Sequence, residues 1–490
     1  MTALDPNLPV VVGVGQSIDR PADPADGLDA LALMEQAALA ARDDAGAERV
    51  LAELEQIVVV QGVWRYPDPG RALAQRVGAV DAASSLTPNG GNSPQSAVSA
   101  LARSIQAGDL DLAMVVGGEV VHTRHKCRAA DVTFAETDQG DIARAPMFGT
   151  ELGMSSDHES ERGFSRPAVI YPLFESAIRA HRGETHPEHR ARIGRLWEGL
   201  NRVAVDNPYA WVRTPMRADD IITPGPDNRM VGYPYTKAMN SNWFVNQGAA
   251  VIVCSSAKAA ALGVSRDRWV FVHSGADACA TTLFSRRDDF HSSPAIGESG
   301  RAALRLAGAG IDDVAVLDLY SCFPSAVQLT MGELGIGGDR IVTTTGGMSF
   351  AGGPLNNYVT HAVATLVDRV RTAGLGLVHG NGGYATKEAF GIYGTEPPAH
   401  GYRHADVQDR VDAYPSREVD EGHTGPATVE AYTVLHDTDG PERALITLLN
   451  DSGQRVLAGT TDADAMAALV ADEYIGTSVT VAPGGVVELN

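Results

Sequence analysis

Cysteines are scarce in this sequence, and no long apolar run occurs. The four cysteines lie too far apart to form a recognised metal-ligand pair or a disulfide framework, which predicts reduced thiols and no bound metal. Every apolar stretch falls short of the ~20 residues that a membrane span requires, and the N-terminal residues lack the basic and apolar parts of a signal peptide. We therefore expect a cytoplasmic protein with no membrane partner.

Basic residues are also few. Lys and Arg number 39 against 61 Asp and Glu, which gives a formal net charge of -22. Nucleic acids and anionic membranes are bound through clusters of Lys and Arg, so this composition argues against both as partners. The 490 residues are enough for roughly two or three domains with a substantial core.

Residues 87–119 combine a glycine-rich turn, a helix and a strand. Gly90 and Gly91 supply a turn that is free of Cβ constraints, and apolar residues then recur at helical spacing as far as Gly108. Residues 110–116 form a short apolar run that is typical of a buried strand, and Gly117 and Gly118 are expected to end it. Such a unit presents its loop to a ligand at the helix N-terminus.

The same order of parts occurs twice along the chain. Each copy contains an apolar strand, a helix, a second strand, and a glycine-rich loop that leads into another helix. This repetition predicts two α/β halves with ligand loops at strand ends and helix N-termini. The predicted parts are residues 9–15, 28–45 and 57–61 in the first copy, and residues 269–273, 298–310 and 314–320 in the second, where the loop and helix from Gly346 match those of residues 87–108.

Two further regions differ in composition from these halves. Residues 120–235 are rich in Arg, His, Pro and Asp and indicate an inserted loop domain. Residues 401–422 form a polar linker, and residues 423–490 alternate as short strands around turns. The C-terminal region is therefore predicted to be a small β-rich domain.

The run AVSALARSIQAGDLDLAMVVGGE resembles the helix and strand that follow the reactive cysteine in the thiolase superfamily, with the sterol-carrier-type thiolases nearest. This resemblance implies a duplicated, layered α/β/α/β/α fold: residues 1–265 form the N-terminal half with its insertion, and residues 266–400 the C-terminal half. Residues 423–490 resemble the OB-type antiparallel β-barrels that accompany thiolase-like proteins. The barrel is acidic and poor in aromatic residues, which argues against oligonucleotide binding.

The resemblance also indicates a changed active site. The thiolase nucleophile lies six residues before the position of Ala97, where this chain has Gly91, and the activating histidine of the Gly-His-Pro loop corresponds to Gly353. A glycine cannot attack a thioester, so the covalent route of ordinary thiolases is closed at this position. Ser93 lacks an adjacent base, and thiolases have a cysteine at the position of Cys322 without acylating it, so we expect neither to replace the nucleophile.

Two residues are candidates for proton transfer. The sterol-carrier-type motif His-Asp-Cys-Phe matches residues 320–323, so Tyr320 stands where a histidine would bind the thioester oxygen. Its hydroxyl could donate a hydrogen bond or act as a general acid, although an ordinary core aromatic is the alternative. His379 lies at or beside the position of the second thiolase cysteine and could act as a base, unless it is a surface or backbone-bonded histidine.

The expected ligand is a CoA thioester, with no other cofactor and no metal. Backbone amides of residues 91–93 and 381–383 could form an oxyanion-binding nest. Trp243 stands where many thiolases have a small serine beside the pantetheine arm. The substrate-binding residues predicted from the resemblance are Asn92, Ser93, Trp243, Cys322, Gly347, Asn381 and Gly382.

The resemblance implies an acyl-CoA-binding protein of lipid or sterol metabolism, which homology would name an acetyl-CoA acyltransferase but which lacks cysteine-dependent thiolase activity. One alternative is an aldol-type carbon–carbon lyase acting on an acyl-CoA, in which Tyr320 with His379 or Tyr384 moves protons around an enolate. Another is a non-catalytic protein that binds a protein partner through its C-terminal barrel. Because thiolases commonly pair, a dimer is possible.

Overall fold

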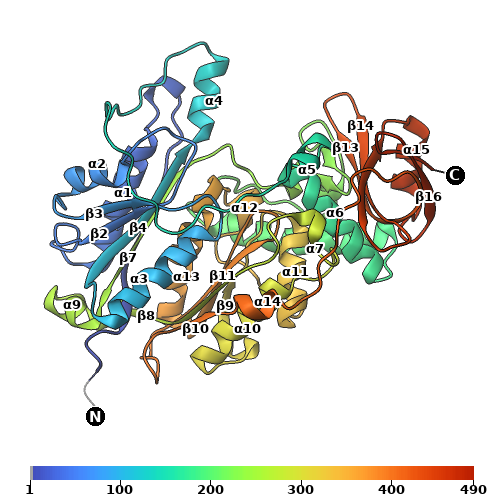
Figure 1. Ribbon diagram of the computed structural model, residues 1–490. Helices are drawn as coiled ribbons and strands as arrows, with labels where there is room; N and C mark the ends of the chain where they lie inside the picture. The colour runs from blue at the N-terminus through green and yellow to red at the C-terminus, as the bar shows by residue number, and fades with distance from the viewer. Residues whose placement is uncertain (1–3, 490) are drawn as a thin grey trace.

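The computed structural model describes residues 4–489 and consists of a large α/β body with a small barrel beside it (Figure 1). The body contains the two predicted halves, joined by a short pairing of β1 with β8. The strand order is β3-β2-β4-β7-β1 in the first half and β8-β11-β10-β9 in the second, where β12 also pairs with β8. The predicted duplicated α/β fold is confirmed.

The first half is built from β1 (Pro9–Ile18), α1 (Ala30–Ala45), β2 (Gln56–Val59), α2 (Pro69–Val77), β3 (Ala83–Leu86), α3 (Ser93–Ala107), β4 (Leu112–Val120), β7 (Asn246–Ser255) and α9 (Ser256–Ala261). The second half is built from β8 (Val270–Cys279), α10 (Pro294–Ala307), β9 (Val314–Asp318), α11 (Pro324–Leu334), α12 (Gly347–Phe350), α13 (Tyr358–Ala373), β10 (Leu375–Gly382), β11 (Lys387–Gly394), β12 (Arg403–Asp406) and α14 (Gln408–Val411).

Helices α3 and α13 form the central layer between the two halves. Each of them contacts strands of both halves, α3 through β7 and β11 and α13 through β7 and β10. Helix α3 buries Ala97, Leu101 and Ile105, the residues whose spacing predicted it. This layer fixes the loop before α3 in the middle of the molecule, next to the ends of strands from the other half.

Strand β4 extends beyond its predicted end. Gly117 and Gly118 were expected to terminate it, but the strand continues through both to Val120. A Cβ atom on Gly117 would lie 2.3 Å from the Asn357 side chain, and one on Gly118 would lie 2.9 Å from the Ala30 carbonyl oxygen. The glycines therefore permit close packing against neighbouring elements and do not form a turn.

The inserted region is mostly helical and joins the body to the barrel. It contains α4 (Val121–Ala129), α5 (Asp157–Glu161), α6 (Pro167–His181), α7 (His186–Asp206), α8 (Ala218–Ile222), β5 (Met230–Gly232) and β6 (Tyr235–Thr236). Helices α6 and α7 pack on α11, and α6 also packs on strand β13 (Gly425–His436). None of the helices within residues 4–489 is both long and apolar enough to cross a membrane.

The outer strand β3 is covered by a segment of the same chain. Leu86 donates a backbone hydrogen bond to Pro146 (2.9 Å) and accepts one from Phe148 (2.7 Å), which places residues 146–148 along the strand. An uncovered edge strand offers unpaired N–H and C=O groups to another chain. Here the segment takes up part of that edge.

The C-terminal strands close into a five-stranded barrel, as predicted. Their order is β14-β15-β17-β16-β13, and pairing of β13 with β14 closes the ring. The elements are β13, β14 (Pro441–Leu449), β15 (Arg455–Thr460), α15 (Ala463–Ala471), β16 (Ser478–Ala482) and β17 (Val486–Glu488). The preceding segment is more than a polar linker, because residues 403–406 form β12 on the main sheet. Four residues are too few for alternation to reveal a strand.

Candidate functional site

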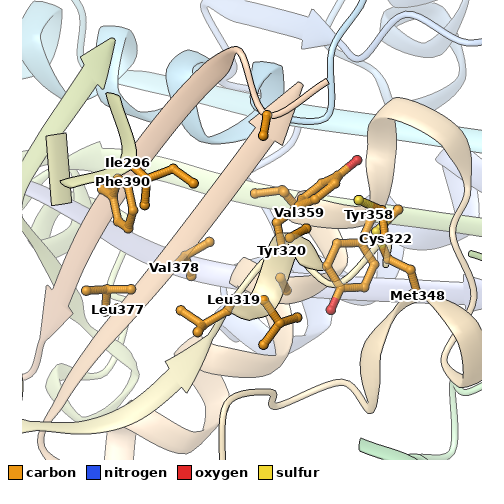
Figure 2. Packing of buried hydrophobic residues seen from close by; sticks show 14 of the residues in the cluster. Ile296, Leu319, Tyr320, Cys322, Met348, Tyr358, Val359, Leu377, Val378 and Phe390 are labelled. Carbon is orange, nitrogen blue, oxygen red and sulfur yellow. The ribbon is translucent and has the colours of Figure 1, made fainter. Parts of the chain in front are cut away.

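Tyr320 occupies the space into which a side chain at position 91 would project. A Cβ atom on Gly91 would lie 2.0 Å from the Tyr320 hydroxyl oxygen and 2.5 Å from the main-chain oxygen of Asn381. Tyr320 follows β9, is 7% exposed, and packs edge-on against Tyr358 with ring centroids 5.8 Å apart. Figure 2 shows it among Tyr358, Val359 and Cys322. The phenol thus fills the space beside Gly91, the position that the resemblance predicts for the thiolase nucleophile.

Burial keeps both polar side chains of this loop neutral. It raises the pKa of Tyr320 well above its ordinary value, with the nearby Cys322 and Glu388 adding to the effect. Burial also raises the pKa of the Cys322 thiol to about 12. At neutral pH the phenol can therefore donate a hydrogen bond to an oxygen, whereas Cys322 is a thiol and a poor nucleophile.

The space beside Gly353, the predicted counterpart of the activating histidine, is filled as well. A Cβ atom on Gly353 would lie 2.2 Å from the Ser241 hydroxyl oxygen, and the Gly353 amide donates to the Asn242 carbonyl at 2.8 Å. Trp243 follows in the same loop but lies at the surface, 44% exposed, with its ring 4.8 Å from that of Phe244. Ser241 therefore occupies the space into which a side chain at position 353 would project, while Trp243 faces solvent.

The glycines at the end of β10 let this strand lie directly on the loop before α3. A Cβ atom on Gly380 would lie 3.1 Å from the Asn92 Cα, and one on Gly382 would lie 2.3 Å from the Asn92 side-chain oxygen. The Ser93 amide of the predicted oxyanion nest already donates to the Gly90 carbonyl (3.0 Å). The structure thus brings Asn92 and Gly382 together beside Gly91, with part of the nest already hydrogen-bonded.

The Asn381 side chain points to the other face of β10. Its amide nitrogen lies 3.4 Å from the Tyr171 hydroxyl, and its side-chain oxygen is buried without a hydrogen-bond partner among the described residues. Tyr171 in turn stacks on Phe323 at 4.7 Å. Only the main chain of Asn381 therefore faces Gly91.

His379 shares that second face of β10 and lies away from the loop before α3. Its Nδ1 is 3.1 Å from the Thr330 hydroxyl and its Nε2 is 2.8 Å from Glu388, while its ring stacks on Phe390 at 4.5 Å. Figure 2 shows Phe390 beside Ile296, on α10. This geometry supports a histidine held by hydrogen bonds in the core, and a role as base stays a prediction.

The hydrogen bonds of His379 define its protonation. Because the Thr330 hydroxyl donates to the Ala326 carbonyl, it accepts a hydrogen bond from Nδ1–H, which leaves Nε2 to accept a hydrogen bond from the Glu388 carboxylic acid. Burial lowers the pKa of His379 to about 3 and raises the pKa of Glu388 well above its ordinary value. The pair is therefore a neutral imidazole bonded to a neutral carboxylic acid, although the two groups lie at ion-pair distance.

A second buried histidine gives a testable dependence of stability on pH. Burial lowers the pKa of His361 to about 3 in the folded chain, whereas an unfolded histidine titrates near 6.5. The unfolded state thus takes up a proton that the folded state does not between pH 6.5 and 3, so stability falls as the pH falls. We expect wild type to lose about 2 kcal/mol relative to His361→Gln between pH 7 and 5, measured by urea unfolding. A constant difference would contradict this prediction.

Gly347 and Tyr384 are the remaining predicted residues. Gly347 has a φ of +76°, and a Cβ atom there would lie 2.5 Å from Leu200 and 3.1 Å from the Ser321 hydroxyl oxygen, which places it beside the Tyr320 loop. Tyr384 is buried, with its hydroxyl 3.5 Å from Ser155. The structure thus brings together Gly91, Tyr320 and the main chain of Asn381. Sequence reasoning missed Ser241, whose only signal was its place two residues before Trp243. No group of three His, Cys, Asp or Glu side chains within residues 4–489 is placed to hold a metal.

Comparisons with known proteins agree with this fold. The model of a family described as the thiolase-like protein type 1 additional C-terminal domain matches residues 406–486. The crystal structure of a monomeric SCP2-thiolase like protein type 1 (STLP1) from Mycobacterium smegmatis is 31% identical to this chain. The match covers 100% of both chains with a TM-score of 0.85. A search of curated protein sequences finds no significant match.

More distant structures share the fold of the body. The Ltp2-ChsH2(DUF35) aldolase is 17% identical, with a TM-score of 0.58 over 79% of this chain and 98% of that chain. The acetyl-CoA acetyltransferase from Syntrophomonas wolfei is also 17% identical, with a TM-score of 0.56 over 80% of this chain and 100% of that chain. The match to the Mycobacterium smegmatis protein along the whole chain, together with the family match of residues 406–486, shows that the chain belongs to the SCP2-thiolase-like proteins of type 1, with their additional C-terminal domain.

Proposed function

We propose that this protein binds acyl-CoA thioesters in lipid or sterol metabolism and does not catalyse cysteine-dependent thiolysis or condensation. The observation that carries the proposal is the Tyr320 hydroxyl, which stands 2.0 Å from the place of a Cβ atom at Gly91. Ser241 fills the place of the activating histidine in the same way. Nucleophile and base positions have changed together, while the glycine loops that surround a thioester are present.

Composition and surface support the rest of this proposal. The acidic chain suits a cytoplasmic protein without a nucleic-acid or anionic-membrane partner. The segment that covers β3 supports a monomer, and the similar protein from Mycobacterium smegmatis is described as monomeric.

Calorimetric titration tests the proposal directly. Purified protein is titrated with CoA, acetyl-CoA and a long-chain or steroid acyl-CoA. We expect saturable binding that strengthens with the acyl group, and no cleavage of acetoacetyl-CoA by the wild-type protein. Absence of binding to all of these ligands would contradict the proposal and favour a non-catalytic protein that acts through a protein partner.

An aldol-type carbon–carbon lyase is the second candidate function. It is supported by a protonated phenol at the expected thioester position, since such a group can donate a hydrogen bond to an enolate oxygen. If the protein is a lyase, Tyr320→Phe removes that donor, and we expect at least a hundredfold loss of turnover with thioester affinity unchanged. A lyase activity that survives the substitution would exclude this role for Tyr320.

A further inference from the structure

A cavity of about 570 Å³ runs along the flank of α3, beyond the glycine loop. Ser96 and Ala100 line it from α3, and Asn92 lines it from just before that helix. Phe148 and Leu152 line it from the segment that covers β3 and continues beyond it. Its volume is in the range of small-molecule sites, which is about 300–1,000 Å³. Tyr320, Gly353 and Trp243 do not line it, whereas Asn92 and Ser93 do, so the cavity borders the glycine loop without containing Tyr320.

Lys387 is a buried cation at one end of this cavity. It is 5% exposed, and its Nζ donates to the main-chain oxygens of Asn89 (2.8 Å) and Leu152 (3.4 Å). An ammonium group has three donors, so one is left for another acceptor. No carboxylate of residues 4–489 pairs with it within 4.0 Å, and burial lowers its pKa. The charge of Glu151 opposes this lowering but forms no ion pair with Lys387, so the buried ammonium keeps a donor that an anion can bind.

The acidic groups around the cavity have hydrogen-bond partners other than Lys387. The Asp277 carboxylate accepts hydrogen bonds from the Ser96 hydroxyl and from His404 (2.7 Å). Asp406 accepts a hydrogen bond from the Gln408 amide at 2.9 Å, and Glu388 is bonded to His379. Arg103 also lines the cavity, and no ion pair of Arg103 occurs among the residues described. Lys387 and Arg103 are therefore the groups of the lining that can meet an anion.

Part of the wall is apolar. Ala97, Ala100, Phe148, Leu152 and Ala278 line the space together with polar residues of the loop before α3. Small residues on α3 leave room for an aliphatic or ring system along the helix, where burial of apolar surface contributes about 25 cal/mol per Å². The cavity thus combines one buried cation with a partly apolar wall.

We propose that this cavity binds the free form of a hydrophobic carboxylic acid, with its carboxylate on the Lys387 ammonium and its apolar body between α3 and the Phe148–Leu152 segment. A CoA thioester lacks this carboxylate, because its acyl carbon is bonded to sulfur. The site goes beyond the proposed function and does not depend on it.

Calorimetric titration with octanoate tests the site, with octanol as the uncharged probe of the same length. We expect saturable binding of octanoate, and an affinity for octanol that is about tenfold or more lower. Lys387→Met removes the cation, and Ala100→Phe fills the apolar space without touching it. Each substitution should lower the affinity for octanoate by about tenfold or more. Lys126→Met, at an exposed position on α4, is the matched control and should leave the affinity unchanged.

Three outcomes would overturn the proposal: no saturable octanoate binding to the wild-type protein, equal binding of octanol, or unchanged affinity in both variants. Ala100 is only partly buried, so Ala100→Phe keeps the test available if Lys387→Met does not fold. The same proteins are titrated with acyl-CoA in a separate experiment. If octanoate binds and no acyl-CoA binds, the result contradicts the proposed function and leaves this proposal intact.

Discussion

Replacement of Gly91 with cysteine is expected to destabilise the protein and not to create thiolase activity. The new Cβ atom would lie 2.0 Å from the Tyr320 hydroxyl oxygen and 2.5 Å from the Asn381 main-chain oxygen, distances that force both groups to move. Overpacking of a tight core usually costs about 1–3 kcal/mol, and we expect about 3 kcal/mol or more because a backbone oxygen is involved. Chemical denaturation measures the loss, and an acetoacetyl-CoA thiolysis assay measures activity.

Two further variants separate sterics from chemistry. Gly199→Cys is the matched control, since nothing lies within 4 Å of a Cβ atom at that position. The double variant Gly91→Cys/Tyr320→Ala removes the ring but leaves the Asn381 oxygen in place, so we expect only partial recovery of stability and still no thiolysis, because no histidine stands at Gly353. A stable Gly91→Cys protein that cleaves acetoacetyl-CoA would contradict this account.

The fold could be predicted from the sequence because its signals are local. The helical spacing of residues 97–105 gave α3, and alternation in residues 425–460 gave the barrel strands. The prediction was wrong where a glycine can have two structural roles. Gly117 and Gly118 were expected to end a strand and instead permit close packing within it. The sequence shows that a glycine lacks a side chain, but only the neighbouring residues in the fold show whether that serves a turn or close packing.

The candidate site could be predicted only in part. Comparison with the thiolase loops indicated Gly91, Tyr320 and Gly353 as site positions. The contact between Gly91 and Tyr320 could not be predicted, because these residues are far apart in the chain. His379 depended on the register of β10, where a shift of one residue moves a side chain to the opposite face. The burial of Lys387 could not be predicted from the sequence. Its ammonium group is held by the main-chain oxygens of Asn89 and Leu152, which lie far from it in the chain.

Arg455 is expected to be the residue that holds the barrel on the body most strongly. Its guanidinium is fully buried and forms a two-bond pair with Glu430 of the barrel, with Nε at 2.7 Å from the carboxylate. It also donates to the main-chain oxygens of Ser285 (2.7 Å) and Arg287 (2.5 Å) in the second half of the body, and lies 4.2 Å above the Phe290 ring. One side chain thus satisfies acceptors on both sides of the interface.

Arg455→Met should therefore lower stability by about 3–5 kcal/mol, because it leaves the Glu430 carboxylate and two buried carbonyl groups without their partner. Calorimetric unfolding measures this loss, and limited proteolysis between residues 407 and 424 reports separation of the barrel. Arg410→Met removes an exposed arginine whose pair with Glu298 is open to solvent, so it should change stability by less than about 1 kcal/mol.

The double variant Arg455→Met/Glu430→Gln distinguishes the ion pair from the contacts with the body. Neutralising Glu430 removes the unpaired charge, so part of the lost stability should return, while the carbonyl groups of residues 285 and 287 stay unpaired. Faster cleavage in residues 407–424 should then persist, because docking depends on those carbonyl groups. If Arg455→Met unfolds and is cleaved like the wild-type protein, the barrel is held by its apolar contacts with α6 and not by this arginine.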